Sequence, residues 1–168
     1  MEEIQTLGLS KSWKELVLYY APEGTAHVGL LKGILSQMGI KVKNLTSQRC
    51  IQKIGYLAGA EGFEKRAVNE GFEKYAPVMD KELLLFCGFS EERLEELLDK
   101  MKKADIPKIG LKAIVTETNA HWTVYRLYKQ LCEEQKAMSH GSYSYYKIRK
   151  LIPRRITCSI LSDFTAIY

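Results

Sequence analysis

Short apolar runs alternate with helix-like repeats along the first 135 residues. The runs at 16–20, 83–87 and 111–116 are rich in residues that favour strands, and residues 40–45 alternate apolar and polar positions. A run without polar alternation, such as 83–87, is typical of a strand covered on both faces. The pattern therefore predicts four strands, with 40–45 at an edge of the sheet.

Between and after these strands, apolar residues recur with helical spacing in three stretches. Gly39 follows the first stretch, where a left-handed residue would end a helix. Thr25 and Ser90 are predicted to cap the first and second helices, and Thr118 or Asn119 the third. The predicted helices cover residues 30–38, 94–101 and 122–132.

Residues 47–80 are the least regular part of the pattern, with few periodic apolar positions. One short helix is predicted near 61–69, and a segment of this length inside a compact domain is usually functional or only partly structured. Its Gly-Tyr-Leu-Ala-Gly stretch at 55–59 has neither the dinucleotide nor the Walker spacing. Nucleotide binding is therefore not the favoured interpretation of these glycines.

The element order predicts an α/β fold. We favour a small three-layer parallel sheet of about four strands in the order 2-1-3-4, flanked by helices. The alternative is a ferredoxin-like βαββαβ plait, which the same elements give if 47–80 only closes a hairpin. The two-sided apolar strands and the long connection favour the first. Residues 1–135 form this domain, with 47–80 as an irregular insertion.

In an open parallel sheet, ligands bind beyond the carboxyl ends of the strands. Three polar or glycine-bearing turns would meet at that edge, each leading into a helix N-terminus that favours anions. The alternative is that these residues only cap helices. The candidate ligand-binding residues are Gly24, Thr25, Gly88, Ser90, Thr116, Thr118, Asn119, His121 and Trp122.

Two of these residues have chemistry of their own. His121 could serve as a general acid or base, and Trp122 could stack on a flat ligand. In the alternative, Trp122 anchors the last helix on the sheet and His121 is solvated. The sequence presents no nucleophile with a base partner, no carboxylate pair and no metal-ligand spacing, so we expect no catalytic residues, metal or cofactor.

The net charge of +5 belongs to the last 33 residues. Residues 1–135 carry 19 Lys+Arg and 19 Asp+Glu, whereas residues 136–168 carry six against one. Aromatic and basic residues interleave in this tail, as in surfaces that bind single-stranded nucleic acid. We therefore keep two interpretations, nucleic-acid binding through residues 143–155 and a partly ordered or disordered tail without such a role.

The chain carries no apolar run of membrane-spanning length and begins without a secretory signal pattern, so we expect a cytoplasmic protein that does not enter a membrane. Its four cysteines are 26 to 45 residues apart and form no Cys-x-x-Cys pair. They are expected to be small apolar core residues in a reducing compartment.

Residues 112–123 read Lys-Ala-Ile-Val-Thr-Glu-Thr-Asn-Ala-His-Trp-Thr. With Leu-Leu-Phe-Cys-Gly-Phe at 84–89 and the glycines of 55–62, they resemble the bacterial family called domain of unknown function 3783. The resemblance covers roughly residues 14–135. Members often have Pro where this chain has Glu117. The resemblance implies a small, mostly stand-alone bacterial protein with no assigned activity.

The leading hypothesis is a non-enzymatic regulatory module that binds a small, anionic ligand or a partner protein at the carboxyl edge of its sheet. The alternatives are a small enzyme with His121 as acid or base, and nucleic-acid binding through the tail.

Overall fold

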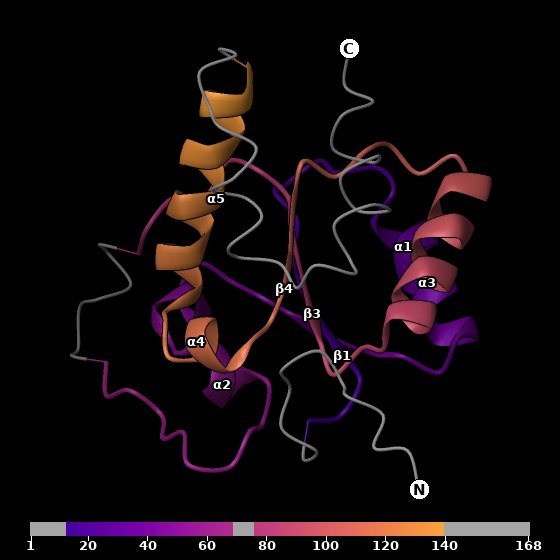
Figure 1. Cartoon of the computed structure of the whole chain (residues 1–168). Helices are drawn as coiled ribbons and strands as arrows, with labels where there is room; N and C mark the ends of the chain where they lie inside the picture. The colour runs from indigo at the N-terminus through magenta and orange to yellow at the C-terminus, as the bar shows by residue number, and fades with distance from the viewer. Residues whose placement is uncertain (1–12, 69–75, 140–168) are drawn as a thin grey trace, which may run out of the picture.

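The computed structural model describes residues 13–68 and 76–139. They fold into four strands and a set of longer and shorter helices (Figure 1). The elements are, in chain order, β1 Leu16–Tyr20, α1 Val28–Gln37, β2 Lys41–Asn44, the 3₁₀ helix η1 Arg49–Ile51, α2 Ile54–Leu57, β3 Leu83–Cys87, α3 Glu91–Lys103, β4 Leu111–Ile114, α4 Glu117–Ala120 and α5 Val124–Ser139.

The strands form one mixed sheet in the order β2-β1-β3-β4. The α/β class and the strand order agree with the sequence-based prediction. The outer pairs β1–β2 and β3–β4 are parallel, but the central pair β1–β3 is antiparallel. The prediction of an all-parallel sheet is therefore wrong for one pair of strands, β1 and β3. The ferredoxin-like alternative is also wrong, because the two strands of each βαβ unit are neighbours here instead of being split by another strand.

The path of residues 45–82 explains the antiparallel centre. Asn44 ends β2 beside Tyr19, and Leu83 begins β3 beside Tyr20, so the chain leaves and re-enters the sheet at the same end. The return is fixed by the hydroxyl of Tyr20, which donates to the Met79 carbonyl oxygen at 2.8 Å. A parallel β3 would have had to start at the opposite end.

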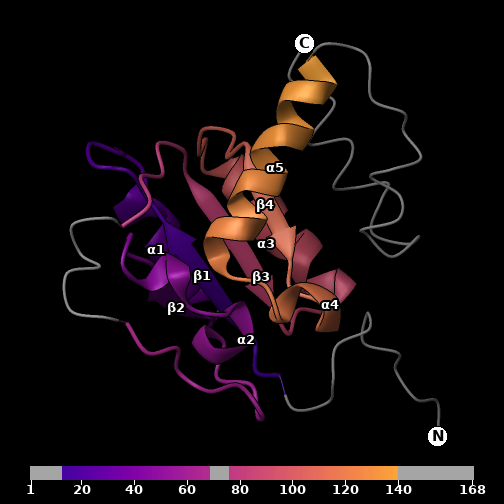
Figure 2. The same cartoon turned by 90° about the vertical axis from the view of Figure 1, so that its left-hand side faces the viewer.

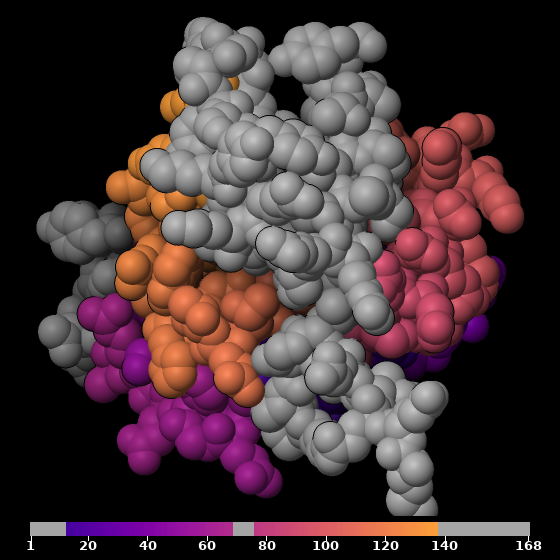
Figure 3. All heavy atoms as spheres, viewed as in Figure 1, coloured from indigo at the N-terminus to yellow at the C-terminus, as the bar shows by residue number. Residues whose placement is uncertain are grey.

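Helices cover both faces of the sheet and make three layers (Figures 1 and 2). Successive β1 residues face opposite layers: Val17 and Tyr19 pack with α1 and α3, whereas Leu18 packs with α2 and α5. All five residues of β3 are buried, as its unbroken apolar run predicts. In the space-filling view, α3 and α5 lie on opposite sides of the molecule (Figure 3).

Helix α3 follows its sequence pattern closely. Leu94, Leu97 and Met101 are its buried residues, and the Ser90 side chain accepts a hydrogen bond from the backbone N–H of Arg93. Acidic residues occupy its first turn and basic residues its last, so the charges complement the helix dipole. The predicted cap and amphipathic face are confirmed.

Two local predictions are wrong. Residues 61–68 are not helical, and the short helices of this region are η1 and α2 instead. The single last helix is divided into α4 and α5, because Thr116 caps the first and the Thr123 hydroxyl accepts from the Arg126 backbone N–H in the second. Within the described residues, no helix is long and apolar enough to cross a membrane. The tail prediction for 143–155 lies outside the described residues.

Candidate functional site

The antiparallel centre separates the predicted site residues into two groups. Gly24 and Thr25 follow β1 at the end of the sheet where β3 begins, whereas the turns after β3 and β4 lie at the opposite end. The expected meeting of all three turns at one edge is therefore wrong. The second group comprises Gly88, Ser90, Thr116, Thr118, Asn119, His121 and Trp122.

Gly24 and Thr25 belong to a tight turn. Gly24 has a φ of +84°, and the Thr25 hydroxyl donates to the Pro22 carbonyl oxygen at 2.7 Å. Thr25 does not cap α1, because His27 is the N-cap residue and no side chain bonds to the free amides there.

Gly88 and Ser90 shape the turn after β3. Gly88 has a φ of +69°, and a Cβ at this position would lie 2.7 Å from the Lys14 carbonyl oxygen and 2.8 Å from that of Trp13. Ser90 caps α3. The fold itself therefore explains both residues, Gly88 through its close backbone contacts and Ser90 through its capping hydrogen bond.

Thr116 and Asn119 form a capping box around α4. The Asn119 side-chain oxygen accepts from the Thr116 N–H at 2.8 Å, and the Thr116 hydroxyl accepts from the Asn119 N–H at 3.3 Å. The Asn119 amide nitrogen donates to the Ile114 carbonyl oxygen at 2.9 Å. Both ends of the Asn119 amide are therefore engaged in the fold. Thr118 is exposed on the same short helix.

His121 and Trp122 lie in the connection between α4 and α5. The His121 ring is exposed and lies 4.9 Å from the Phe63 ring, centroid to centroid. In the part of the chain that the structure describes, no carboxylate or nucleophile is hydrogen-bonded to it. The Arg126 guanidinium lies 4.3 Å from the centroid of the Trp122 ring and covers it in a cation–π contact. These contacts are closer to those of residues that anchor the last helix than to those of a catalytic centre.

A second histidine has the polar partner that His121 lacks. His27 Nε2 lies 2.7 Å and 2.9 Å from the two carboxylate oxygens of Glu82, and the Tyr19 hydroxyl donates to the same carboxylate. Burial and the Glu82 carboxylate raise the pKa of Tyr19 above its usual value. The cluster joins β1, the start of α1 and the residue before β3. Sequence reasoning missed it because Glu82 is 55 residues from His27 and 63 from Tyr19.

A cavity of about 370 Å³ opens beside the carboxyl end of β2. This volume is within the range of small-molecule sites. The wall is formed by β2, η1, α2 and the loop that follows α2. Its lining residues are Lys43, Gln48, Arg49, Gln52, Tyr56, Leu57, Lys65 and Val68.

The lining is cationic. The described residues that line the cavity include Lys43, Arg49 and Lys65 and no acidic residue. The Lys43 amine donates to the Leu57 carbonyl oxygen at 2.9 Å, and the Arg49 guanidinium donates to the Asn44 carbonyl oxygen at 3.2 Å. Among the described residues, none of the three cations forms an ion pair with a carboxylate. No carboxylate of the described residues therefore pairs with their charge.

Two contacts hold the loop that forms one wall of the cavity. Gln52 is only 5% exposed, and its amide bonds both the N–H and the carbonyl oxygen of Arg66, at 2.8 and 3.0 Å. The Phe63 ring packs directly on Gly55, where a Cβ would lie 2.7 Å from it. Gly55 thus allows a close approach between helix and loop, and the wall that carries Lys65 is fixed from both sides.

The cavity was not among the predicted sites, although a signal for it exists. Residues 41–68 contain six Lys+Arg and two Asp+Glu. This excess is hidden when residues 1–135 are counted as one block, because acidic segments elsewhere cancel it. Within the described residues, no cluster of His, Cys, Asp and Glu could hold a metal ion.

Residues 82–138 match the family model of a domain of unknown function, DUF3783. The match covers 57 of the 168 residues and is a likeness of this segment to that family. No curated protein and no solved structure matches the chain. The DUF3783 segment begins one residue before β3 and ends within α5. It includes the turns after β3 and β4, whereas all the cavity residues precede it.

Proposed function

We propose that this protein is a non-enzymatic binding module for a small anionic ligand, which it holds in the cavity beside β2. The observation that carries the proposal is a cavity of about 370 Å³ whose lining, among the residues that the structure describes, contains three cations and no acid. An anion placed there would gain charge-assisted hydrogen bonds, which are stronger than neutral ones. The ligand-binding hypothesis from the sequence is kept, and its location moves to the carboxyl end of β2.

The arrangement of the lining supports binding more than catalysis. The described residues that line it include no His, Cys, Ser, Asp or Glu, the side chains that most often act as nucleophile or general base. Its polar residues are lysine, arginine, glutamine and tyrosine, which supply hydrogen-bond donors at neutral pH. Such a set is suited to holding an acceptor-rich ligand.

The proposal is tested by calorimetric titration of the full chain with inorganic phosphate and with citrate at low salt. We expect saturable binding of at least one of them. Arg49→Gln and Lys65→Gln should each weaken it about tenfold or more, since each removes a hydrogen bond to a charged group.

Lys53→Gln is the matched control, because Lys53 is an exposed cation of the same segment that does not line the cavity. It should bind like the wild type. Absence of binding for both anions, or equal weakening by Lys53→Gln, would remove the proposal.

A further inference from the structure

The cavity lining is divided by chemistry. Three cationic side chains and two glutamines supply the polar part, and Tyr56, Leu57 and Val68 form an apolar and aromatic part. Tyr56 and Val68 are not fully buried, so they remain accessible to a ligand. A ligand that used only the cations would leave this apolar surface in contact with water. The lining thus matches a molecule with a charged head and an apolar or flat body.

The charged part of the lining offers donors. Lysine and arginine have no acceptor, and the buried Gln52 already uses its carbonyl oxygen to accept from Arg66. The part of the ligand that faces the three cations should therefore present acceptors. A phosphate monoester carries between one and a half and two negative charges at neutral pH. It also matches the fork of an arginine better than a single point charge would.

We infer that the ligand is a soluble organic phosphate, a phosphate monoester whose body is a flat ring that packs on Tyr56. This inference rests on the proposed anion-binding function and names its ligand class. Aromatic side chains bind flat rings by stacking, which adds binding free energy without hydrogen-bond recognition of the ring. The phosphate is held by side chains here, because no glycine-rich phosphate loop lines the cavity.

The test compares four probes by calorimetry on the full chain: inorganic phosphate, a nucleoside 5′-monophosphate, the same nucleoside without phosphate, and citrate. We expect the monophosphate to bind about tenfold tighter than inorganic phosphate, as one stacking contact would give. The nucleoside alone should bind more weakly than the monophosphate.

Substitutions of Tyr56 test the contribution of the ligand's ring separately from that of its phosphate. Tyr56→Leu keeps an apolar side chain but removes the ring, so it should abolish the tenfold advantage of the monophosphate over inorganic phosphate. Tyr56→Phe should keep the advantage. Persistence of the advantage in Tyr56→Leu would overturn the role of the ring. A thermal melt of each variant establishes that it is folded.

Failure of this inference is distinguishable from failure of the proposed function. If citrate binds as tightly as the monophosphate, and binding still depends on Arg49 and Lys65, the organic-phosphate class is wrong although the anion site stands. If no anion binds, both are wrong. The protein could instead co-sediment with phosphatidic acid vesicles and fail to bind the soluble monophosphate. That result would overturn the inference that the ligand is soluble and would favour a lipid headgroup.

Discussion

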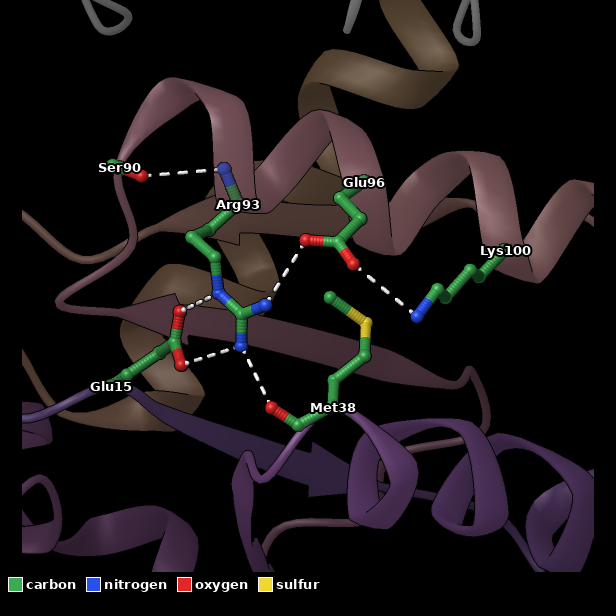
Figure 4. A network of polar contacts seen from close by, with 6 residues as sticks. All are labelled: Glu15, Met38, Ser90, Arg93, Glu96 and Lys100. Atoms are coloured by element: carbon green, nitrogen blue, oxygen red, sulfur yellow. Dashed lines mark hydrogen bonds and ion pairs between the residues drawn. The ribbon is translucent and has the colours of Figure 1, made fainter.

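The guanidinium of Arg93 holds both carboxylate oxygens of Glu15, with Nε–Oε1 at 2.9 Å and Nη2–Oε2 at 3.1 Å (Figure 4). The same guanidinium donates to the Met38 carbonyl oxygen at 2.8 Å and lies 3.0 Å from Glu96. Glu15 precedes β1 and Met38 follows α1, whereas Arg93 is in α3. One side chain therefore ties the βαβ unit formed by β1, α1 and β2 to the unit formed by β3, α3 and β4.

Replacing Arg93 by Met should lower the free energy of unfolding, because the carboxylate of Glu15 and the Met38 carbonyl lose a shared donor that links the two units. Lys100→Met is the control, since the Lys100 amine pairs with Glu96 of its own helix at 3.2 Å. Urea unfolding should show a larger loss for Arg93→Met than for Lys100→Met.

The contact between Arg93 and Glu15 also predicts that the effects of substitutions at these two positions on stability are coupled. In a double-mutant cycle, Glu15→Gln should cost clearly less in the Arg93→Met background than in the wild type, because the paired group is already gone. Additive losses would mean that the contact contributes nothing to stability.

The strand order was predictable from the sequence, but the direction of the central pair was not. An unbroken apolar run such as Leu83–Cys87 reports that both faces of a strand are covered. That condition is met equally by a central strand of a parallel sheet and of a mixed one, so burial does not encode direction. Direction depends on long-range contacts such as Tyr20 with Met79, 59 residues apart.

The site predictions show the same limit. Local signals were reliable where a side chain bonds to backbone three residues away, as Ser90 does with Arg93. The gathering of Lys43, Arg49 and Lys65 around one cavity needs β2, η1 and a loop to be folded together. No spacing rule links these positions, and only the local excess of positive charge indicates them.

Gly88→Ala should be strongly destabilising. The position combines a left-handed φ of +69° with backbone atoms of Trp13 and Lys14 where a Cβ would stand. Gly39→Ala is the matched control, because its φ is +72° and nothing lies within 4 Å of its Cβ position. We expect a loss of about 1 kcal/mol for Gly39→Ala and more than about 2 kcal/mol for Gly88→Ala in urea unfolding. Equal losses would contradict the close approach.

Asn119→Ala should destabilise the protein by about 1 kcal/mol, because it removes the capping box and the bond to the Ile114 carbonyl. Thr118→Ala, on the exposed side of the same short helix, should be nearly neutral. Thermal melts measure both. The loss in Asn119→Ala should be the same with and without added phosphate, whereas a loss that phosphate enlarges would place Asn119 in a binding site.

Gln52→Leu should release the loop wall of the cavity. It removes both hydrogen bonds to the backbone of Arg66, each with a net contribution of about 1 kcal/mol. Hydrogen exchange at the Arg66 amide should accelerate by about tenfold. Gln48→Leu is the control, because Gln48 is exposed and lines the same cavity. Unchanged exchange in Gln52→Leu would show that other contacts hold the loop.

Stability should fall in alkaline solution. Burial raises the pKa of the Cys50 and Cys87 thiols from 9.0 to about 12, and burial also raises that of Tyr128. The folded state therefore keeps protons that the unfolded state releases. Stability is complete below pH 9 and decreases as the pH rises toward 12, by at most about 1.4 kcal/mol per pH unit for each thiol.

Urea unfolding at about pH 8 and pH 10.5 measures this loss. The double variant Cys50→Ala/Cys87→Ala should be less stable than the wild type at pH 8, because it leaves space in the core, yet it should lose less between the two pH values. Leu97→Ala controls for the packing loss, since Leu97 is fully buried and carries no titratable group. Leu97→Ala should keep the full pH dependence. If the free energy of unfolding falls equally between the two pH values in all three proteins, the buried thiols do not cause the loss.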